Sequence, residues 1–132
     1  MILVIDTECA QPIYEQLRDQ IVCGIAANQL KPGEGLPSVR QLASDLGINL
    51  HTANKTYTAL CHEGYIVMDR RRGAIVARNV QNSQDFLFAL SKRLVLAAAE
   101  ARCREIEEDT FIEICRESYQ SLNAPGRLEE IE

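Results

Sequence analysis

The chain lacks the features that mark membrane, secreted or zinc-ribbon proteins. Its 132 residues include no apolar run long enough to span a bilayer, and residues 1–6 have no basic leader of the signal-peptide type. Five cysteines form no CxxC pair and leave an odd number, which argues against a structural zinc site or a disulfide framework. We therefore expect a cytoplasmic location, no membrane contact, reduced and buried thiols, and no metal or other cofactor.

Sequence signatures of catalysis are also missing. The chain has no glycine-rich phosphate loop, no recognisable pair of acid and base carboxylates, and no nucleophile triad. Cys61 stands beside His62, but neighbouring residues of a helix do not face each other, so this pair is not arranged as nucleophile and base. The sequence predicts a protein that is not an enzyme.

An excess of positive charge is absent from the chain as a whole, whose formal net charge is −5. Residues 1–79 are balanced, with eight basic and eight acidic side chains, whereas residues 80–132 have six basic and eleven acidic ones. Between residues 50 and 79 there are five basic side chains and two acidic ones, so this stretch is locally positive. The composition, 46% apolar and 25% charged, is ordinary for a soluble globular protein.

Residues 36–77 have the pattern of a winged helix-turn-helix. Ser38 suits the N-cap of a short helix, and Gly47 suits the left-handed turn that ends it. Asn49 suits the N-cap of the next helix, which we expect to stop at Gly64. Helical spacing places on the inner face of this second helix Ala53, Thr56, Tyr57 and Leu60.

A β-hairpin is predicted after the second helix. Residues 65–68 and 74–77 are β-prone runs, and residues 69–73 between them contain three adjacent arginines. Like charges held together repel, so an exposed triplet is easier to explain if a polyanion neutralises it, with release of counterions. Taken alone, the triplet could equally be an ordinary solvated loop.

The remaining residues, 80–132, are predicted to form two more helices. Ser83 suits the N-cap of the first, which runs to about Glu105 and is apolar around most of its circumference. Such a helix needs cover on more than one side, which a second subunit would provide, although its alanines also have a simpler explanation in helix propensity. The second helix is expected to start at Thr110, in a capping box, and residues 127–132 are expected to fray.

We divide the chain into a DNA-binding domain, residues 1–79, and a helical dimerisation tail, residues 80–132. The fold class is mainly α with a small β wing. The candidate dimer-interface residues are Phe86, Leu87, Leu90, Leu94, Ala97, Ala98, Ala101, Phe111, Cys115 and Tyr119.

Residues 12–76 resemble the DNA-binding domain of the GntR family of bacterial transcriptional regulators. The matching motifs are PIYEQL at 12–17, LKPGEGLPSVRQLA at 30–43, Thr52 with Tyr57 and Leu60, and EGY at 63–65. The short tail, 53 residues after Asn79, resembles the YtrA-like branch of that family. The resemblance implies a homodimeric repressor that binds a palindromic operator in double-stranded DNA, often one that controls a transporter operon.

The resemblance also implies which residues contact DNA. They are Arg40, Asn49, His51, Thr52, Asn54, Lys55, Arg70, Arg71, Arg72 and Gly73. Helical spacing adds Leu50 and Thr58 on the same outer face, and we add Ser38 beside Arg40 at the edge of the groove. Relatives often have proline, arginine or other strongly hydrogen-bonding residues where this chain has Leu50, His51 and Asn54, so their base preference does not transfer. Asn54 could bind an adenine edge, and His51 could donate to a base or a phosphate.

One alternative class remains open alongside a DNA-binding repressor. The winged fold could instead serve as a protein-interaction module whose arginines meet an acidic partner, since a fold alone does not fix function. Two short tail helices enclose little volume, so we expect any small-molecule effector to bind at the dimer or interdomain interface.

Overall fold

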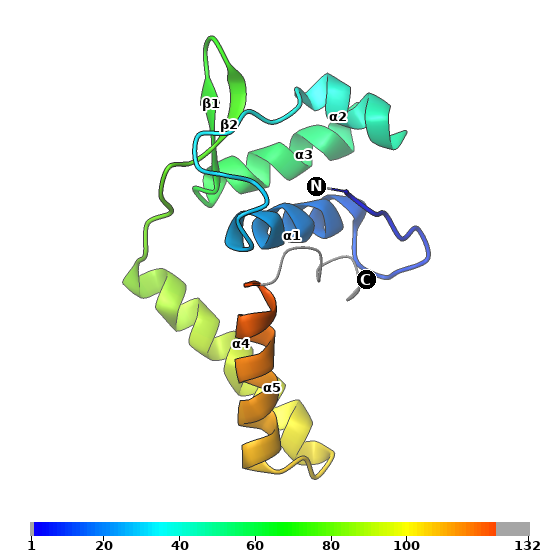
Figure 1. Cartoon of the computed structure of the whole chain (residues 1–132). Coiled ribbons are helices and arrows are strands. Elements are labelled where there is room, and N and C mark those ends of the chain that lie inside the picture. The colour runs from blue at the N-terminus through cyan, green and yellow to red at the C-terminus, as the bar shows by residue number, and fades with distance from the viewer. Residues whose placement is uncertain (1, 124–132) are drawn as a thin grey trace. The chain divides into compact units, whose positions relative to one another are not determined.

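The computed structural model describes residues 2–123, so the expected frayed end at 127–132 lies outside the described residues. The chain is mainly helical with one two-stranded antiparallel sheet, as predicted (Figure 1). It divides into two compact units, with the boundary along the chain between Val80 and Gln81. The elements in chain order are α1 Ile13–Ala26, α2 Val39–Leu46, α3 Leu50–His62, β1 Ile66–Asp69, β2 Gly73–Val76, α4 Gln84–Cys103 and α5 Glu108–Ser121.

The helix-turn-helix is built by the local signals that the sequence contains. The Ser38 Oγ accepts a hydrogen bond of 3.1 Å from the backbone N–H of Gln41 at the start of α2. Gly47 ends α2 in the left-handed conformation, with φ of 65°. The Asn49 Oδ1 then accepts a bond of 2.7 Å from the N–H of His51 at the start of α3. The predicted caps and turn are therefore confirmed.

One face of α3 forms the centre of the first unit. This helix packs against both α1 and α2, and its predicted inner face is buried. The Thr56 hydroxyl is fully buried and donates to the carbonyl of Thr52, 3.0 Å away, so its burial leaves no unpaired group. The largest fully buried side chains around this helix are Leu17, Ile21, Leu60, Ile66 and Val76.

The hairpin differs by one residue from the prediction in both strands. Asp69 pairs with Gly73 as the last pair of the β1–β2 ladder, so the loop is only Arg70 to Arg72. Gly73 adopts φ of 74°, which suits glycine and lets the chain close this short loop. Sequence pattern also missed a third extended segment: Gly33 and Leu36 donate backbone hydrogen bonds of 2.8 Å to Val76 and Ala74 of β2.

The N-terminal arm, residues 2–12, lies on α1, to which two glutamine side chains attach it. The Gln20 amide accepts from the Val4 N–H and donates to the Val4 carbonyl, and the Gln16 amide makes the same pair of bonds with Asp6. Gln16 is buried and also donates to the carbonyl of Gln11. The two side-chain amides therefore pair with the backbone N–H and C=O groups of the arm, as a neighbouring strand does in a sheet.

The second unit contains α4 and α5. The Ser83 Oγ caps α4 through a bond of 3.0 Å from the Phe86 N–H, as predicted, and α4 ends at Cys103, slightly before the predicted end. The capping box at Thr110 is wrong, because α5 begins at Glu108 and its N-cap residue, Glu107, makes no side-chain cap. The carboxylates of Glu108 and Asp109 instead lie in the first turn, where the helix dipole favours negative charge.

Tyr57 links α3 to the start of α2. Its phenol O–H donates a hydrogen bond of 2.6 Å to the carbonyl of Pro37, directly before the capping Ser38. Burial of the phenol raises the pKa of Tyr57 to about 12. Since α2 contains Arg40, this bond also positions a residue expected to contact DNA.

Replacing Tyr57 with phenylalanine is expected to lower the free energy of unfolding by about 1 kcal/mol, because the Pro37 carbonyl loses its donor. Urea unfolding near neutral pH measures this loss. The wild type should also lose stability as the pH rises from about 10 to about 12, since the folded state keeps the phenol protonated longer than the unfolded state. Tyr57→Phe should flatten this loss. Tyr65→Phe is the matched control, and equal stability losses in the two variants would contradict the assignment.

Candidate nucleic-acid interface

The outer face of α3 presents most of the residues predicted to contact DNA. His51, Asn54, Lys55 and Thr58 are exposed on this face, and Thr52 is half-exposed. Asn49 and Ser38 each use one side-chain oxygen for a helix cap, which leaves the Asn49 amide N–H₂ and the Ser38 O–H as free donors. The face is therefore rich in groups that can hydrogen bond to an external partner.

Two hollows flank this row of side chains. One, of about 330 Å³, lies where α2 and α3 begin and is lined by Val39, Arg40, Leu50, His51 and Asn54. The other, of about 380 Å³, is lined by His51, Thr52, Asn54, Lys55 and Thr58. The structure thus brings Arg40, which is remote in sequence from Asn54, to the same surface as the outer face of α3.

Arg40 is free to bind an external group. It is exposed, and among residues 2–123 it makes no hydrogen bond or ion pair. Lys55, by contrast, has an internal partner, because its Nζ lies 4.3 Å from the centroid of the Tyr14 ring on α1. Sequence analysis missed this role of Tyr14, since the two residues come from different helices.

The wing loop is ordered by an acidic residue. The Asp69 Oδ1 accepts hydrogen bonds from the backbone N–H groups of Arg71, at 2.8 Å, and Arg72, at 3.0 Å. These two bonds lower the pKa of Asp69, because they stabilise its charged form. The loop conformation is therefore favoured at every pH at which Asp69 is ionised.

The three wing arginines are not equivalent. The Arg72 Nη2 turns back and donates a bond of 3.0 Å to the carbonyl of Gly33. The exposed side chains of Arg70 and Arg71 make no hydrogen bond or ion pair within the described part of the chain. Gly73, included in the predicted contact set, lies in β2 opposite Asp69. Arg70 and Arg71 are therefore the free cations of this wing.

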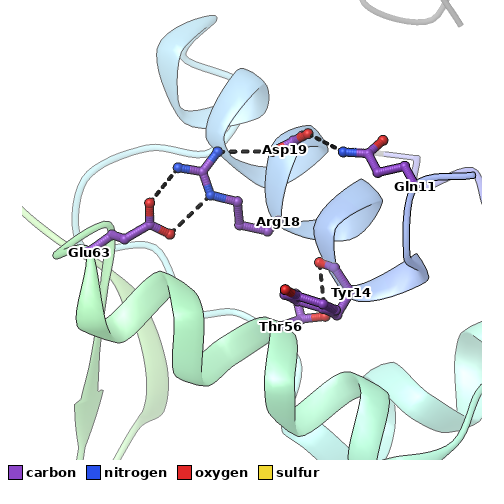
Figure 2. A network of polar contacts seen from close by, with 6 residues as sticks. All are labelled: Gln11, Tyr14, Arg18, Asp19, Thr56 and Glu63. Carbon is purple, nitrogen blue, oxygen red and sulfur yellow. Dashed lines mark hydrogen bonds and ion pairs between the residues drawn. The ribbon is translucent and has the colours of Figure 1, made fainter. Parts of the chain in front are cut away.

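Arg18 of α1 joins the end of α3 to the rest of the fold (Figure 2). Its Nη2 and Nε donate to the two carboxylate oxygens of Glu63, at 2.6 and 3.0 Å, and its Nη1 donates to Asp19 at 2.9 Å. The hydrogen bond to Glu63 is the main cause that raises the pKa of Arg18. The guanidinium also lies 5.5 Å from the centroid of the Tyr65 ring, just before β1. Arg18 thus positions both the recognition helix and the wing.

The tail residues predicted to form a dimer interface differ in exposure. One of them, Ala101, is buried, and the half-buried ones are Leu90, Ala97, Ala98, Phe111 and Cys115. The exposed ones are Phe86, Leu87, Leu94 and Tyr119. Other large apolar side chains are exposed on the same two helices, and the prediction omitted them: Phe88, Val95, Leu96, Ile112 and Ile114.

The tail also contains a hollow of about 550 Å³, a size usual for small-molecule sites. It is lined by Ala98, Ala101, Arg102, Ile106, Glu108 and Phe111.

The cysteines are less buried than predicted. Cys9 and Cys103 are exposed, because one lies in the N-terminal arm and the other in the last turn of α4, while the remaining three are half-buried. Across residues 2–123, no three His, Cys, Asp or Glu side chains gather as metal ligands. No helix in that range combines the length and apolarity needed to cross a bilayer.

Together these elements define a winged helix-turn-helix protein: α2 and α3 meet at a tight turn, and a basic hairpin follows. A profile of the bacterial regulatory proteins of the gntR family matches residues 10–76, about half of the sequence. The chain belongs to the gntR family, as its motifs predicted.

Among the curated proteins similar to this chain are two transcriptional regulators. The repressor YtrA of Bacillus subtilis is 38% identical over 79 residues, which are 60% of this chain and 61% of the repressor. The regulator Rv1152 of Mycobacterium tuberculosis is 34% identical over 76 residues, which are 58% of this chain and 63% of that protein. The chain thus matches just over three fifths of the length of each relative.

Solved structures support the same family and fold. YtrA from Sulfolobus acidocaldarius, a GntR-family transcription factor, is 41% identical with a TM-score of 0.60, over 74% of this chain and 99% of that one. A transcriptional antiterminator from Listeria monocytogenes EGD-e has a TM-score of 0.86 over 94% of both chains. At 23% identity, this second likeness shows the fold alone.

A double-mutant cycle tests the positioning role of Arg18. Arg18→Gln and Glu63→Gln, singly and together, are expected to give a coupling energy of about 1 kcal/mol in urea unfolding, because the contact is two-pronged and partly buried. Arg116→Gln and Glu113→Gln form the control cycle on α5, where both side chains are about half exposed and a smaller coupling, about 0.3 kcal/mol, is expected. Equal coupling in the two cycles would contradict the assignment.

Proposed function

We propose that this protein is a sequence-specific DNA-binding transcriptional repressor. The observation that carries the proposal is the surface where Arg40, His51 and Asn54 stand together as donors for base edges, since among residues 2–123 their side chains make no hydrogen bond or ion pair. Membership of the gntR family and similarity to the repressor YtrA support the same function.

In the proposed complex, α3 enters the major groove. The helix N-terminus, from Asn49 to Asn54, faces base edges, while Ser38 and Arg40 lie at the groove edge or the backbone. Arg70 and Arg71 contact phosphates or the minor groove beside the site, and Arg72 supports the loop from Gly33. This division separates residues that read sequence from residues that supply affinity.

The proposed repressor is a homodimer that binds a palindromic operator. Exposed apolar side chains on α4 and α5 support this part of the proposal. A monomeric protein in water rarely exposes so many large apolar side chains on neighbouring helices, and a second subunit would cover them. Two identical units related by a twofold axis would meet two half-sites of opposite orientation. The dimer interface is proposed to centre on Phe86, Leu87, Leu94 and Tyr119.

Two substitutions on the DNA surface should have different effects. Asn54→Ala is expected to cost about 1–3 kcal/mol of discrimination at one base pair, because it removes an amide that reads a base edge. Arg71→Ala is expected to weaken binding to all sequences and to reduce the slope of log K against log salt by about 1.

Both effects can be measured by fluorescence anisotropy on a duplex selected from a random pool, over a salt titration. Arg93→Ala on α4 is the control and should leave the slope unchanged. If the wild type selects no sequence and shows no salt-dependent binding, the protein is an interaction module and the repressor function is wrong.

Leu94→Glu is expected to convert the proposed dimer into monomers, because burying an unpaired carboxylate at the interface weakens association by about 3 kcal/mol. Sedimentation equilibrium measures the change in mass. Lys92→Glu places the same carboxylate on the opposite face of the same helix, away from Leu87 and Leu94, and should leave the dimer intact. A wild-type monomer at micromolar concentration would contradict the proposed assembly.

A further inference from the structure

Leu50 is an apolar residue on a surface otherwise made of polar and basic groups. It is the first residue of α3, and its side chain is 47% exposed although it is one of the larger apolar residues of the unit. It lines the hollow of about 330 Å³ together with the half-buried Val39 of α2. Within the described chain, no other apolar side chain lines this hollow.

The polar residues around the hollow indicate what kind of group enters it. Arg40, His51 and Asn54 complete its lining, and all three are exposed. Guanidinium and amide groups match the major-groove edges of guanine and adenine. Among the groups that base pairs present in the major groove, one is apolar: the C5-methyl of thymine. An apolar floor between such donors therefore matches a thymine beside a purine.

The position in the fold favours a DNA base over a protein partner. N-terminal residues of a recognition helix are the ones that contact base edges in a helix-turn-helix complex. A protein partner would need an apolar area much larger than one leucine and one half-buried valine provide. The site is the right size for one methyl group and the edge of its base.

We propose that Leu50, with Val39 in the same hollow, is a thymine-methyl site that determines specificity at one base pair of each half-site. This inference rests on the proposed DNA-binding function and adds a residue that reads sequence by apolar contact. Val39 supports the contact, and Leu50 makes it.

Deoxyuridine substitution tests the proposal, because it removes the C5-methyl and leaves the pairing edge unchanged. The probe is the duplex that the wild type selects from a random pool, with each thymine replaced by deoxyuridine in turn. At one position per half-site we expect Kd to rise about fourfold, the value of one buried methyl group. For Leu50→Ala, the thymine and deoxyuridine duplexes should bind with the same Kd within about 1.5-fold.

Two further variants keep the test specific. Leu50→Met retains an apolar side chain and should retain most of the deoxyuridine effect. Val67→Ala shortens a side chain of β1 that is 45% exposed, close to the exposure of Leu50, and should leave the effect unchanged. Circular dichroism melts of all variants verify that each is folded.

The outcomes separate this inference from the proposed function. Sequence-specific binding in which no thymine responds to deoxyuridine overturns the thymine-methyl site while the repressor function stands. A response that persists in Leu50→Ala assigns the methyl contact to another residue and also overturns the proposal. If the wild type selects no sequence at all, the proposed function itself fails, and this inference fails with it.

Discussion

The first unit depends on one constraint: α3 must bury one face completely while its opposite face stays bare. Ala53, Thr56, Tyr57 and Leu60 are all buried, and they fix the rotation of α3 against α1 and α2. At about 100° per residue, this rotation leaves Asn54, Lys55 and Thr58 on the outside. Rotating α3 to hide those groups would expose the core. The packing of its inner face therefore determines which side chains its outer face exposes to solvent.

Electrostatic organisation follows from how the fold uses its acidic residues. Residues 50–79 contain two acidic side chains, and each has an internal role. Glu63 is paired with Arg18, and Asp69 accepts backbone N–H groups of its own loop. Both carboxylates therefore stabilise structure close to the basic groups. Within residues 2–123, Arg40, Arg70 and Arg71 make no hydrogen bond or ion pair through their side chains, and they face solvent on a chain whose formal net charge is negative.

Local signals in the sequence predicted the helix-turn-helix well. Ser38, Gly47 and Asn49 act within three residues of themselves, so propensity and capping rules suffice for them. The same rules failed at Thr110, because two acidic residues before it extend α5 by favourable interaction with the helix dipole.

Contacts between distant segments could not be predicted from the sequence. Arg18 and Glu63 are 45 residues apart, and either could have been an ordinary solvated charge. The backbone bonds from Gly33 and Leu36 to β2 likewise depend on the folded path of the loop. The shift of the hairpin by one residue has a different, local cause: Asp69 accepts hydrogen bonds from the backbone N–H groups of Arg71 and Arg72 and pairs with Gly73, which adds one residue to each strand at the loop end.

The division of the chain into two units has an energetic consequence for the proposed repressor. A single α3 presents a short reading surface, and a single wing has two free arginines, so one unit alone offers few contacts to DNA. Joining two such units makes the second half-site contact intramolecular, which multiplies affinity without any new contact to a base. The exposed apolar side chains of α4 and α5 are unfavourable in free energy for an isolated chain, and burying them between two subunits would stabilise the proposed dimer. Operator affinity would then depend on protein concentration through the tail, and specificity would remain with the few side chains around Leu50.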